Sequence, residues 1–226
     1  MSILDLVFPK QCISCGKKGR YVCSRCIGEV NFSKQLCIVC GRASIDGATH
    51  TRCQKPFGLD GSVSIWKYEK VVRESIIKLK YKFAYEIAKE LSFYISNFLK
   101  ENITALSEVA VLTPVPLYKT RKNWRGFNQS VEVGKMLAKD MGWSFVDDIV
   151  VRTAKTKPQT ELKGKERLSN IRGVFGFNDS YKTQIADCVP LIIFDDVWTT
   201  GTTLKEMCKV LKRNGAKKVW SLTIAK

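Results

Sequence analysis

A short apolar run followed by two aspartates constrains the fold of this chain more than any other feature. The run spans residues 189–194 and contains branched side chains without polar alternation, which is typical of a strand covered on both faces of a parallel sheet. Asp195 and Asp196 follow it directly. Because open α/β sheets bind ligands at the carboxyl ends of their strands, the pattern predicts such a sheet with a ligand site at the two aspartates.

Small residues after the aspartates predict a site for an anion. Gly201 lets the backbone approach a ligand closely, and the helical pattern over residues 205–211 directs unpaired N–H groups back at the loop. Threonine hydroxyls add further donors. We therefore expect a phosphate group to bind at the loop residues Thr199, Thr200, Gly201, Thr202 and Thr203.

The two aspartates would repel a bare phosphate, so the ligand should also carry groups that carboxylates bind. A sugar phosphate meets both demands, with its phosphate on the loop and its ribose hydroxyls on Asp195 and Asp196. The stretch resembles the phosphoribosyl pyrophosphate (PRPP) motif of type I phosphoribosyltransferases, an apolar strand, two acidic residues and a T-T-G-x-T loop. Trp198 departs from that motif, in which a smaller residue is commoner. An ordinary strand–turn–helix with exposed acids is the alternative for so short a motif.

Seven of the nine cysteines lie between Cys12 and Cys53, six of them in C-x-x-C pairs. His50, the only histidine, stands three residues before Cys53 and completes a fourth pair. Four pairs of soft ligands fit two tetrahedral zinc ions. We group them in sequential order, and an interleaved pairing is the alternative. The first site then has Cys12, Cys15, Cys23 and Cys26, and the second has Cys37, Cys40, His50 and Cys53.

Zinc is favoured over disulfide bonds because cytosolic thiols stay reduced and the number of cysteines in the segment is odd. Both zinc ions should be structural, since protein ligands fill every coordination position. The segment has few large apolar residues, so metal binding should supply its folding energy. Its basic residues either contact nucleic acid or form a solvated face; they are Lys17, Lys18, Arg20, Arg25, Arg42 and Arg52.

Length and charge limit the class of protein further. The 226 residues are enough for a zinc module over residues 1–56 and a larger domain over residues 57–226, since the composition changes after Pro56. The net charge of +17 predicts a polyanionic partner or ligand. No apolar run approaches the roughly 18 residues of a membrane span, and no secretory signal is recognisable, so we expect a cytoplasmic protein.

Periodicity predicts the remaining elements of the larger domain. Strands are expected over residues 61–68, 109–112, 149–152 and 219–224, and helices over residues 71–79, 84–99 and from Asn128 to Met141. Pro114 and Pro116 should end the strand before them, because proline cannot extend the hydrogen-bond ladder.

Two polar segments carry further candidate ligand contacts. Residues 119–130 are basic with interleaved aromatic side chains, and Arg125 is placed to hold pyrophosphate. The alternatives are a nucleic-acid stripe with stacking by Trp124 and Phe127, or a solvated loop. A long polar segment follows the strand at 149–152, and we expect a functional loop there, with Arg152 and Gln159 as ligand contacts. A plain connector is the alternative.

Taken together, these motifs resemble the competence protein F (ComF/GntX) family over nearly the whole chain. The matching residues are the C-x-x-C pairs, Leu79-Lys80-Tyr81, Pro114-Val115-Pro116, Arg125-Gly126-Phe127-Asn128-Gln129, Arg152, Thr156, Gln159, Leu162, Arg167, Asn170, Phe175 and the stretch from Asp195 to Gly201. His50 departs from the family, which more often has cysteine there. The resemblance implies a zinc finger joined to a type I phosphoribosyltransferase-like domain, a parallel twisted sheet with helices on both faces. It also implies PRPP contacts at Lys80, Pro114, Val115 and Pro116.

The resemblance implies a role in natural transformation, in the uptake or processing of single-stranded DNA. Partners would be the DNA and other competence proteins at the inner membrane, with peripheral association at its inner face. As an enzyme, the protein would displace pyrophosphate from PRPP with a nitrogen nucleophile. Asp195 and Asp196 would favour the positive charge that develops on the ribose, and Mg²⁺ would neutralise the pyrophosphate.

Two other functions compete with this expectation. One is a nucleobase or amine phosphoribosyltransferase of salvage metabolism, against which the zinc module argues, because base salvage needs none. No residue stands out as an acceptor pocket either. The other is a DNA-binding adaptor with a vestigial PRPP site, against which the intact pair Asp195 and Asp196 argues.

Overall fold

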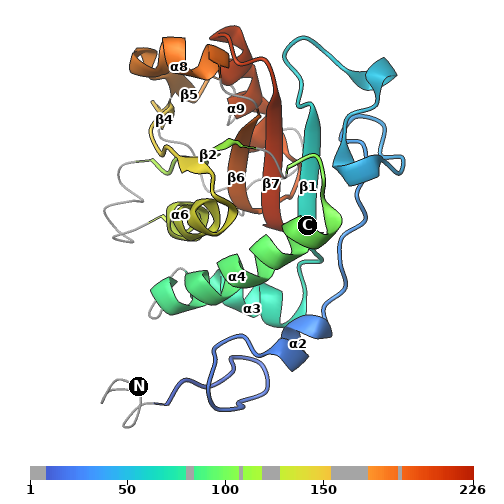
Figure 1. Cartoon of the computed structure of the whole chain (residues 1–226), viewed down its shortest axis with the longest axis vertical. Coiled ribbons are helices and arrows are strands. Elements are labelled where there is room, and N and C mark those ends of the chain that lie inside the picture. The colour runs from blue at the N-terminus through green and yellow to red at the C-terminus, as the bar shows by residue number, and fades with distance from the viewer. Residues whose placement is uncertain (1–8, 80–83, 107–108, 119–127, 154–172, 188–189) are drawn as a thin grey trace.

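A five-stranded parallel sheet forms the centre of the protein (Figure 1). The computed structural model describes residues 9–79, 84–106, 109–118, 128–153, 173–187 and 190–226. Every pair of neighbouring strands in the sheet is parallel. The strand order is β1 (Gly61–Trp66), β7 (Val219–Ala225), β6 (Leu191–Val197), β2 (Val111–Pro114) and β3 (Ser144–Phe145).

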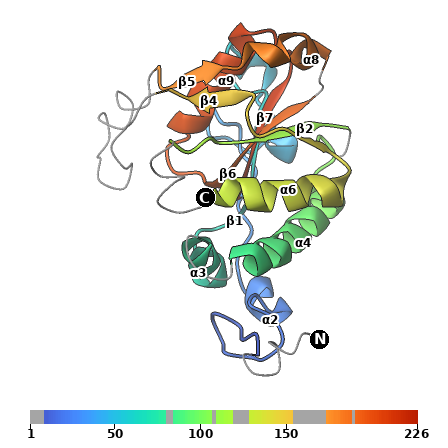
Figure 2. The same cartoon turned by 90° about the vertical axis from the view of Figure 1, so that its left-hand side faces the viewer.

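Helices cover both faces of this sheet (Figure 2). Ile192 and Phe194 of β6 pack in one apolar cluster with three helices, α3 (Lys70–Lys78), α4 (Ala84–Asn102) and α6 (Gln129–Met141). Leu191 and Ile193 point to the other face and pack in a second cluster with α9 (Thr202–Arg213). The unbroken apolar run of β6 is thus buried on both sides, and the predicted α/β architecture is confirmed.

A small two-stranded antiparallel sheet lies outside the main sheet. It pairs β4 (Val150–Arg152) with β5 (Phe175–Phe177), and a 3₁₀ turn, η4 (Asp179–Tyr181), and helix α8 (Lys182–Asp187) follow β5. β5 packs against α9. The strand predicted at 149–152 exists, but its partner is β5. Neither β5, β3 nor α8 is long enough to show a period in the sequence.

Two strands extend further at the carboxyl edge of the sheet than predicted. β2 continues through Thr113 and Pro114, so the prediction that prolines end it after residue 112 was wrong. The ladder continues past the proline because the N–H of Val115 donates to the carbonyl of Phe194 at 2.9 Å. β6 takes in Asp195 and Asp196, since Asp195 pairs with Thr223 of β7. β1 is shorter than predicted and ends at Trp66.

The cysteine-rich segment runs along the β1 edge of the sheet (Figure 1). Its first half carries α2 (Ser24–Gly28), which contacts α3, and its second half carries two 3₁₀ turns, η1 (Ile45–Gly47) and η2 (Thr51–Cys53). The carboxylate of Glu90 on α4 accepts hydrogen bonds from the backbone N–H groups of Tyr21 and Val22 at 3.2 and 2.6 Å. η1 contacts β1. The segment is therefore docked on the α/β part at both of its halves.

The helices also show whether a described segment could span a membrane. Among the described residues, no helix combines the length and apolarity that a bilayer-spanning segment requires.

Candidate functional site

The eight predicted metal ligands gather in two separate clusters. In each cluster all four ligand atoms lie within 4.8 Å of one another. The grouping is sequential, so the interleaved alternative is excluded. The Sγ atoms of Cys15 and Cys23 are 3.7 Å apart, which is close to the about 3.8 Å expected for two sulfurs on one tetrahedral zinc ion. The clusters are Cys12, Cys15, Cys23 and Cys26, and Cys37, Cys40, His50 and Cys53.

The two ends of the His50 ring have different partners. Its Nδ1 faces the second cluster, 3.3 Å from the Sγ of Cys40, and its Nε2 lies 3.1 Å from the carbonyl oxygen of Ala43. A carbonyl accepts only from a protonated nitrogen, so Nε2 carries the hydrogen and Nδ1 keeps its lone pair for a metal. Ligating histidines are held in this way by the bond from their other nitrogen. His50 thus fits a zinc ligand, as predicted.

The two clusters repeat one local structure. Gly16 and Gly41 both adopt positive φ angles, +73° and +70°, and their N–H groups donate to the carbonyls of Cys12 and Cys37 at 2.8 and 2.9 Å. Burial raises the pKa of both cysteine thiols, but backbone N–H groups nearby outweigh it and lower each pKa to about 6. A thiolate at these two positions is therefore favoured, and thiolates are the form that binds zinc. Both clusters fit structural zinc ions.

The carboxyl edge of the sheet places the two aspartates beside the start of α6. The Oδ1 of Asp195 accepts hydrogen bonds from Ser130 Oγ at 3.3 Å and from the N–H of Asp196 at 2.9 Å. Burial, and then the neighbouring charge of Asp196, raise the pKa of Asp195 well above its usual range. Ionised Asp195 is thus costly in the free protein. A ligand that brings hydroxyl donors or a cation would relieve that cost.

The turn between β6 and α9 has the form expected of an anion site. Gly201 is the N-cap of α9, with a φ of +69°. The hydroxyl oxygens of Thr200 and Thr202 lie 2.8 Å apart, and the Thr200 hydroxyl also accepts from the N–H of Thr202. Trp198 is buried and its indole lies directly behind Gly201, where an added Cβ would be 2.0 Å from the ring. The indole therefore packs against the turn, and position 201 has no room for a side chain.

Pro114 and Val115 lie next to the aspartates, because β2 and β6 are neighbours and Pro114 pairs with Phe194. The carbonyl of Val115 accepts a hydrogen bond from the side chain of Asn128 at 3.1 Å. Asn128 is also the N-cap of α6. The start of α6 is thereby tied to the same edge of the sheet.

Asn128 belongs to the segment that the sequence indicated as a ligand site, but Gln129 and Ser130 were not recognised there as individual site residues. All three are buried polar residues at the start of α6. The side-chain nitrogen of Gln129 is buried and has no hydrogen-bond partner among the described residues. Three polar residues at a helix start do not by themselves indicate a ligand site. They do so only once the fold shows that they lie beside Asp195.

The predicted PRPP contacts stay predictions. Three of them, Lys80, Arg125 and Gln159, lie outside the described residues. Arg152 ends β4, where its guanidinium lies 5.8 Å from the ring centroid of Phe175. Pro116 follows Val115 at the carboxyl edge, outside the β2 ladder.

Comparisons with known proteins bear on the zinc clusters and on the chain as a whole. A family model described as a double zinc ribbon domain matches residues 3–54. The DNA utilization protein YhgH of Escherichia coli (strain K12) is 31% identical over 211 residues, which cover 89% of each chain. Competence protein F of Haemophilus influenzae is 28% identical over 220 residues, 95% of this chain and 90% of the relative. The chain belongs to the competence protein F family.

A third relative, with lower sequence identity, also aligns over most of both chains. Competence protein ComFC of Bacillus subtilis is 26% identical over 222 residues, 92% of this chain and 85% of the relative. The family resemblance predicted from the motifs is thus confirmed. Because the matches span most of each chain, the competence protein F family shares the cysteine-rich segment and the α/β part as one polypeptide.

Proposed function

We propose that the protein binds PRPP at the β6–α9 turn and acts in DNA utilization, in the uptake or processing of single-stranded DNA during natural transformation. The observation that carries the PRPP part is the carboxyl edge of β6. There, Asp195 and Asp196 lie in the last part of the strand, which ends at Val197 before a threonine-rich turn at a helix start. Acids for a sugar and N–H groups for a phosphate thus lie within one short stretch of the chain.

Each part of PRPP has a candidate partner in this arrangement. The 5′-phosphate would accept hydrogen bonds from the turn Thr199–Thr203, at the positive end of the α9 dipole. The ribose hydroxyls would donate to Asp195 and Asp196. The pyrophosphate would lie toward Pro114 and the start of α6, with Mg²⁺ bound mainly through ligand oxygens. In a transfer reaction, the two carboxylates would stabilise positive charge on the ribose.

The DNA part rests on the family and on charge. Relatives carry the names DNA utilization protein and competence protein. The net charge of +17 suits a polyanion. Single-stranded DNA is the proposed macromolecular ligand, with other competence proteins at the inner face of the membrane as partners. This role explains a zinc ribbon on a phosphoribosyltransferase-like domain better than base salvage does.

Calorimetry with PRPP and Mg²⁺ tests the proposal. Wild type should bind, and the double variant Asp195→Asn with Asp196→Asn should not. Glu101→Gln is the matched control, because it removes an exposed carboxylate at the end of α4 and should leave binding unchanged. Equal binding by wild type and the double variant would refute the site. No binding by wild type would favour the adaptor with a vestigial site.

A further inference from the structure

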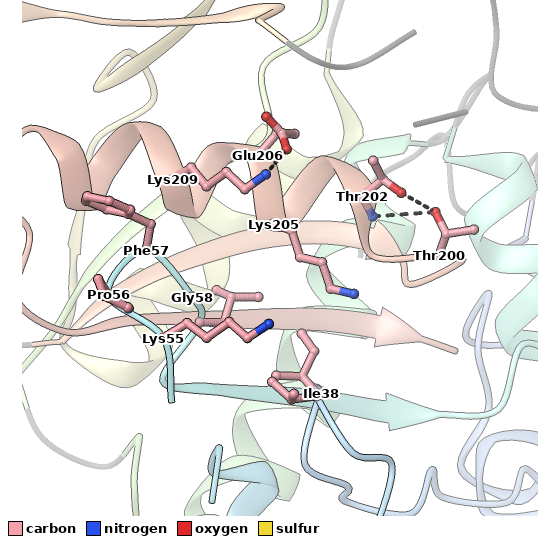
Figure 3. Close-up of a pocket in the computed structure, with 12 residues that line it drawn as sticks. Ile38, Lys55, Pro56, Phe57, Gly58, Thr200, Thr202, Lys205, Glu206 and Lys209 are labelled. Carbon is pink, nitrogen blue, oxygen red and sulfur yellow. Dashed lines mark hydrogen bonds and ion pairs between the residues drawn. The ribbon is translucent and has the colours of Figure 1, made fainter. Parts of the chain in front are cut away.

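We call residues 12–26 and 37–53, which carry the two ligand clusters, the first and second zinc ribbons. A cleft separates the second zinc ribbon from the start of α9 (Figure 3). Its volume is about 760 Å³. One wall is apolar and comes from the ribbon and the segment after it, with Ile38, Phe57 and Leu59. The opposite wall carries Thr200 and Lys205. The cleft thus lies between parts of the chain that are far apart in the sequence.

A second, polar space of about 220 Å³ adjoins the cleft, because Ile38, Thr200 and Lys205 line both. Lys34 and Lys226 line this smaller space. We call the two spaces together the ribbon groove. It borders the proposed phosphate turn through Thr200 and Thr202, but its apolar wall has no part in the proposed PRPP site.

The ribbon groove carries positive charge without compensation. Lys55 and Lys205 are exposed, and Figure 3 shows both side chains reaching into the space between ribbon and helix. Neither has a carboxylate within ion-pair distance in the part of the chain that the structure describes, and the same holds for Lys34. Glu206 also lines the cleft, but it is paired with Lys209. An anionic ligand is therefore favoured.

The groove also offers an aromatic surface. The Phe57 side chain is 47% exposed, and the guanidinium of Arg213 lies 5.5 Å from its ring centroid. An exposed ring beside lysines is the combination by which proteins bind single-stranded nucleic acid, with bases stacked on the ring and phosphates on the cations. A duplex keeps its bases stacked inside and would leave the ring unused.

We infer that the ribbon groove binds a single strand of polynucleotide, with one base against Phe57 and neighbouring phosphates at Lys55 and Lys205. The inference rests on the proposed DNA role and assigns it a place. The strand would lie next to the same turn that is proposed to hold the 5′-phosphate of PRPP. The second zinc ribbon would then form one wall of the DNA site.

Fluorescence anisotropy of a labelled oligothymidylate on the zinc-loaded full chain tests this inference. Lys55→Gln with Lys205→Gln should weaken binding and make the slope of log affinity against log salt shallower by about 1.4, since each phosphate contact on a single strand contributes about 0.7. Lys89→Gln with Lys135→Gln is the matched control, with equal charge change on α4 and α6 across the sheet. The control should leave the slope unchanged.

Phe57→Leu tests the stacking part separately. Leucine keeps an apolar side chain at a half-exposed position, so the melting temperature should hold, while loss of stacking should weaken binding roughly tenfold at every salt concentration. Equal weakening by the groove and control lysine pairs, or unchanged affinity of Phe57→Leu, would overturn the inference while the DNA role stands. If an acidic peptide takes the groove in place of the oligonucleotide, the inference alone fails. If wild type binds no oligothymidylate, the inference and the DNA role both fail. The PRPP calorimetry is unaffected by either outcome.

Discussion

Gly201 is the position at which the β6–α9 turn should be most sensitive to substitution. Its φ of +69° lies in the left-handed region, which costs a residue with a Cβ about 1–2 kcal/mol. A Cβ built on Gly201 would lie 2.0 Å from Cζ2 and 2.4 Å from Cη2 of Trp198, and overpacking of this kind costs about 1–3 kcal/mol. Gly201→Ala should therefore lower the free energy of unfolding by roughly 2–5 kcal/mol.

A double-mutant cycle with Trp198→Leu separates the two costs. The substitution removes the ring atoms behind the turn and is itself destabilising, because Trp198 is only 9% exposed. In that background Gly201→Ala should cost only the backbone part, about 1–2 kcal/mol. The coupling energy should then be about 1–3 kcal/mol.

Urea unfolding of the four zinc-loaded proteins measures this cycle. Zinc must be saturating throughout, so that metal loss does not contribute to the differences. If Gly201→Ala costs the same free energy with and without the indole, the indole does not pack against the turn. The described geometry of the proposed anion site would then be wrong.

Three further predictions concern other parts of the molecule. Asp195→Asn should raise the melting temperature at pH 8, because burial and the charge of Asp196 raise the pKa of Asp195 in the folded state. The stability of wild type is then lost as pH rises through that folded pKa. The gain should vanish below the unfolded pKa of about 4, and a gain independent of pH would contradict this reasoning. Metal analysis should find two zinc ions per chain, with His50→Cys keeping both and His50→Ala losing one; a single ion in wild type would refute the placement of His50. Glu90→Ala should lower the free energy of unfolding by roughly 1.5–3 kcal/mol, because two backbone N–H groups of the first ribbon lose their acceptor; urea unfolding that matches wild type would show that this contact does not dock the ribbon.

The features that the sequence predicts well are the local ones. Pairs of soft ligands two residues apart indicate zinc from their spacing alone, but only the structure decides that the pairs group in sequential order. The β6 stretch is similar, because its apolar run, the pair Asp195 and Asp196, and Gly201 lie close together in the sequence. Helices α4 and α6 are long enough to show their period, and their predicted bounds are close to those observed.

The features that the sequence does not predict depend on contacts between distant segments. Ser130 reaches Asp195 across 65 positions of the chain, and nothing local to either residue indicates the bond. The ribbon groove likewise needs Phe57 and Lys205 on facing walls. The end of β2 was misplaced because proline usually stops a ladder, whereas here β6 continues the pairing through the N–H of Val115.

A crystal structure of the zinc-loaded protein with PRPP and Mg²⁺ tests the central claim most directly. We expect the 5′-phosphate at the backbone N–H groups of the turn Thr199–Thr203, and the ribose hydroxyls within hydrogen-bond distance of Asp195 and Asp196. A turn that stays empty at saturating PRPP, or a ligand bound away from both aspartates, would contradict the account.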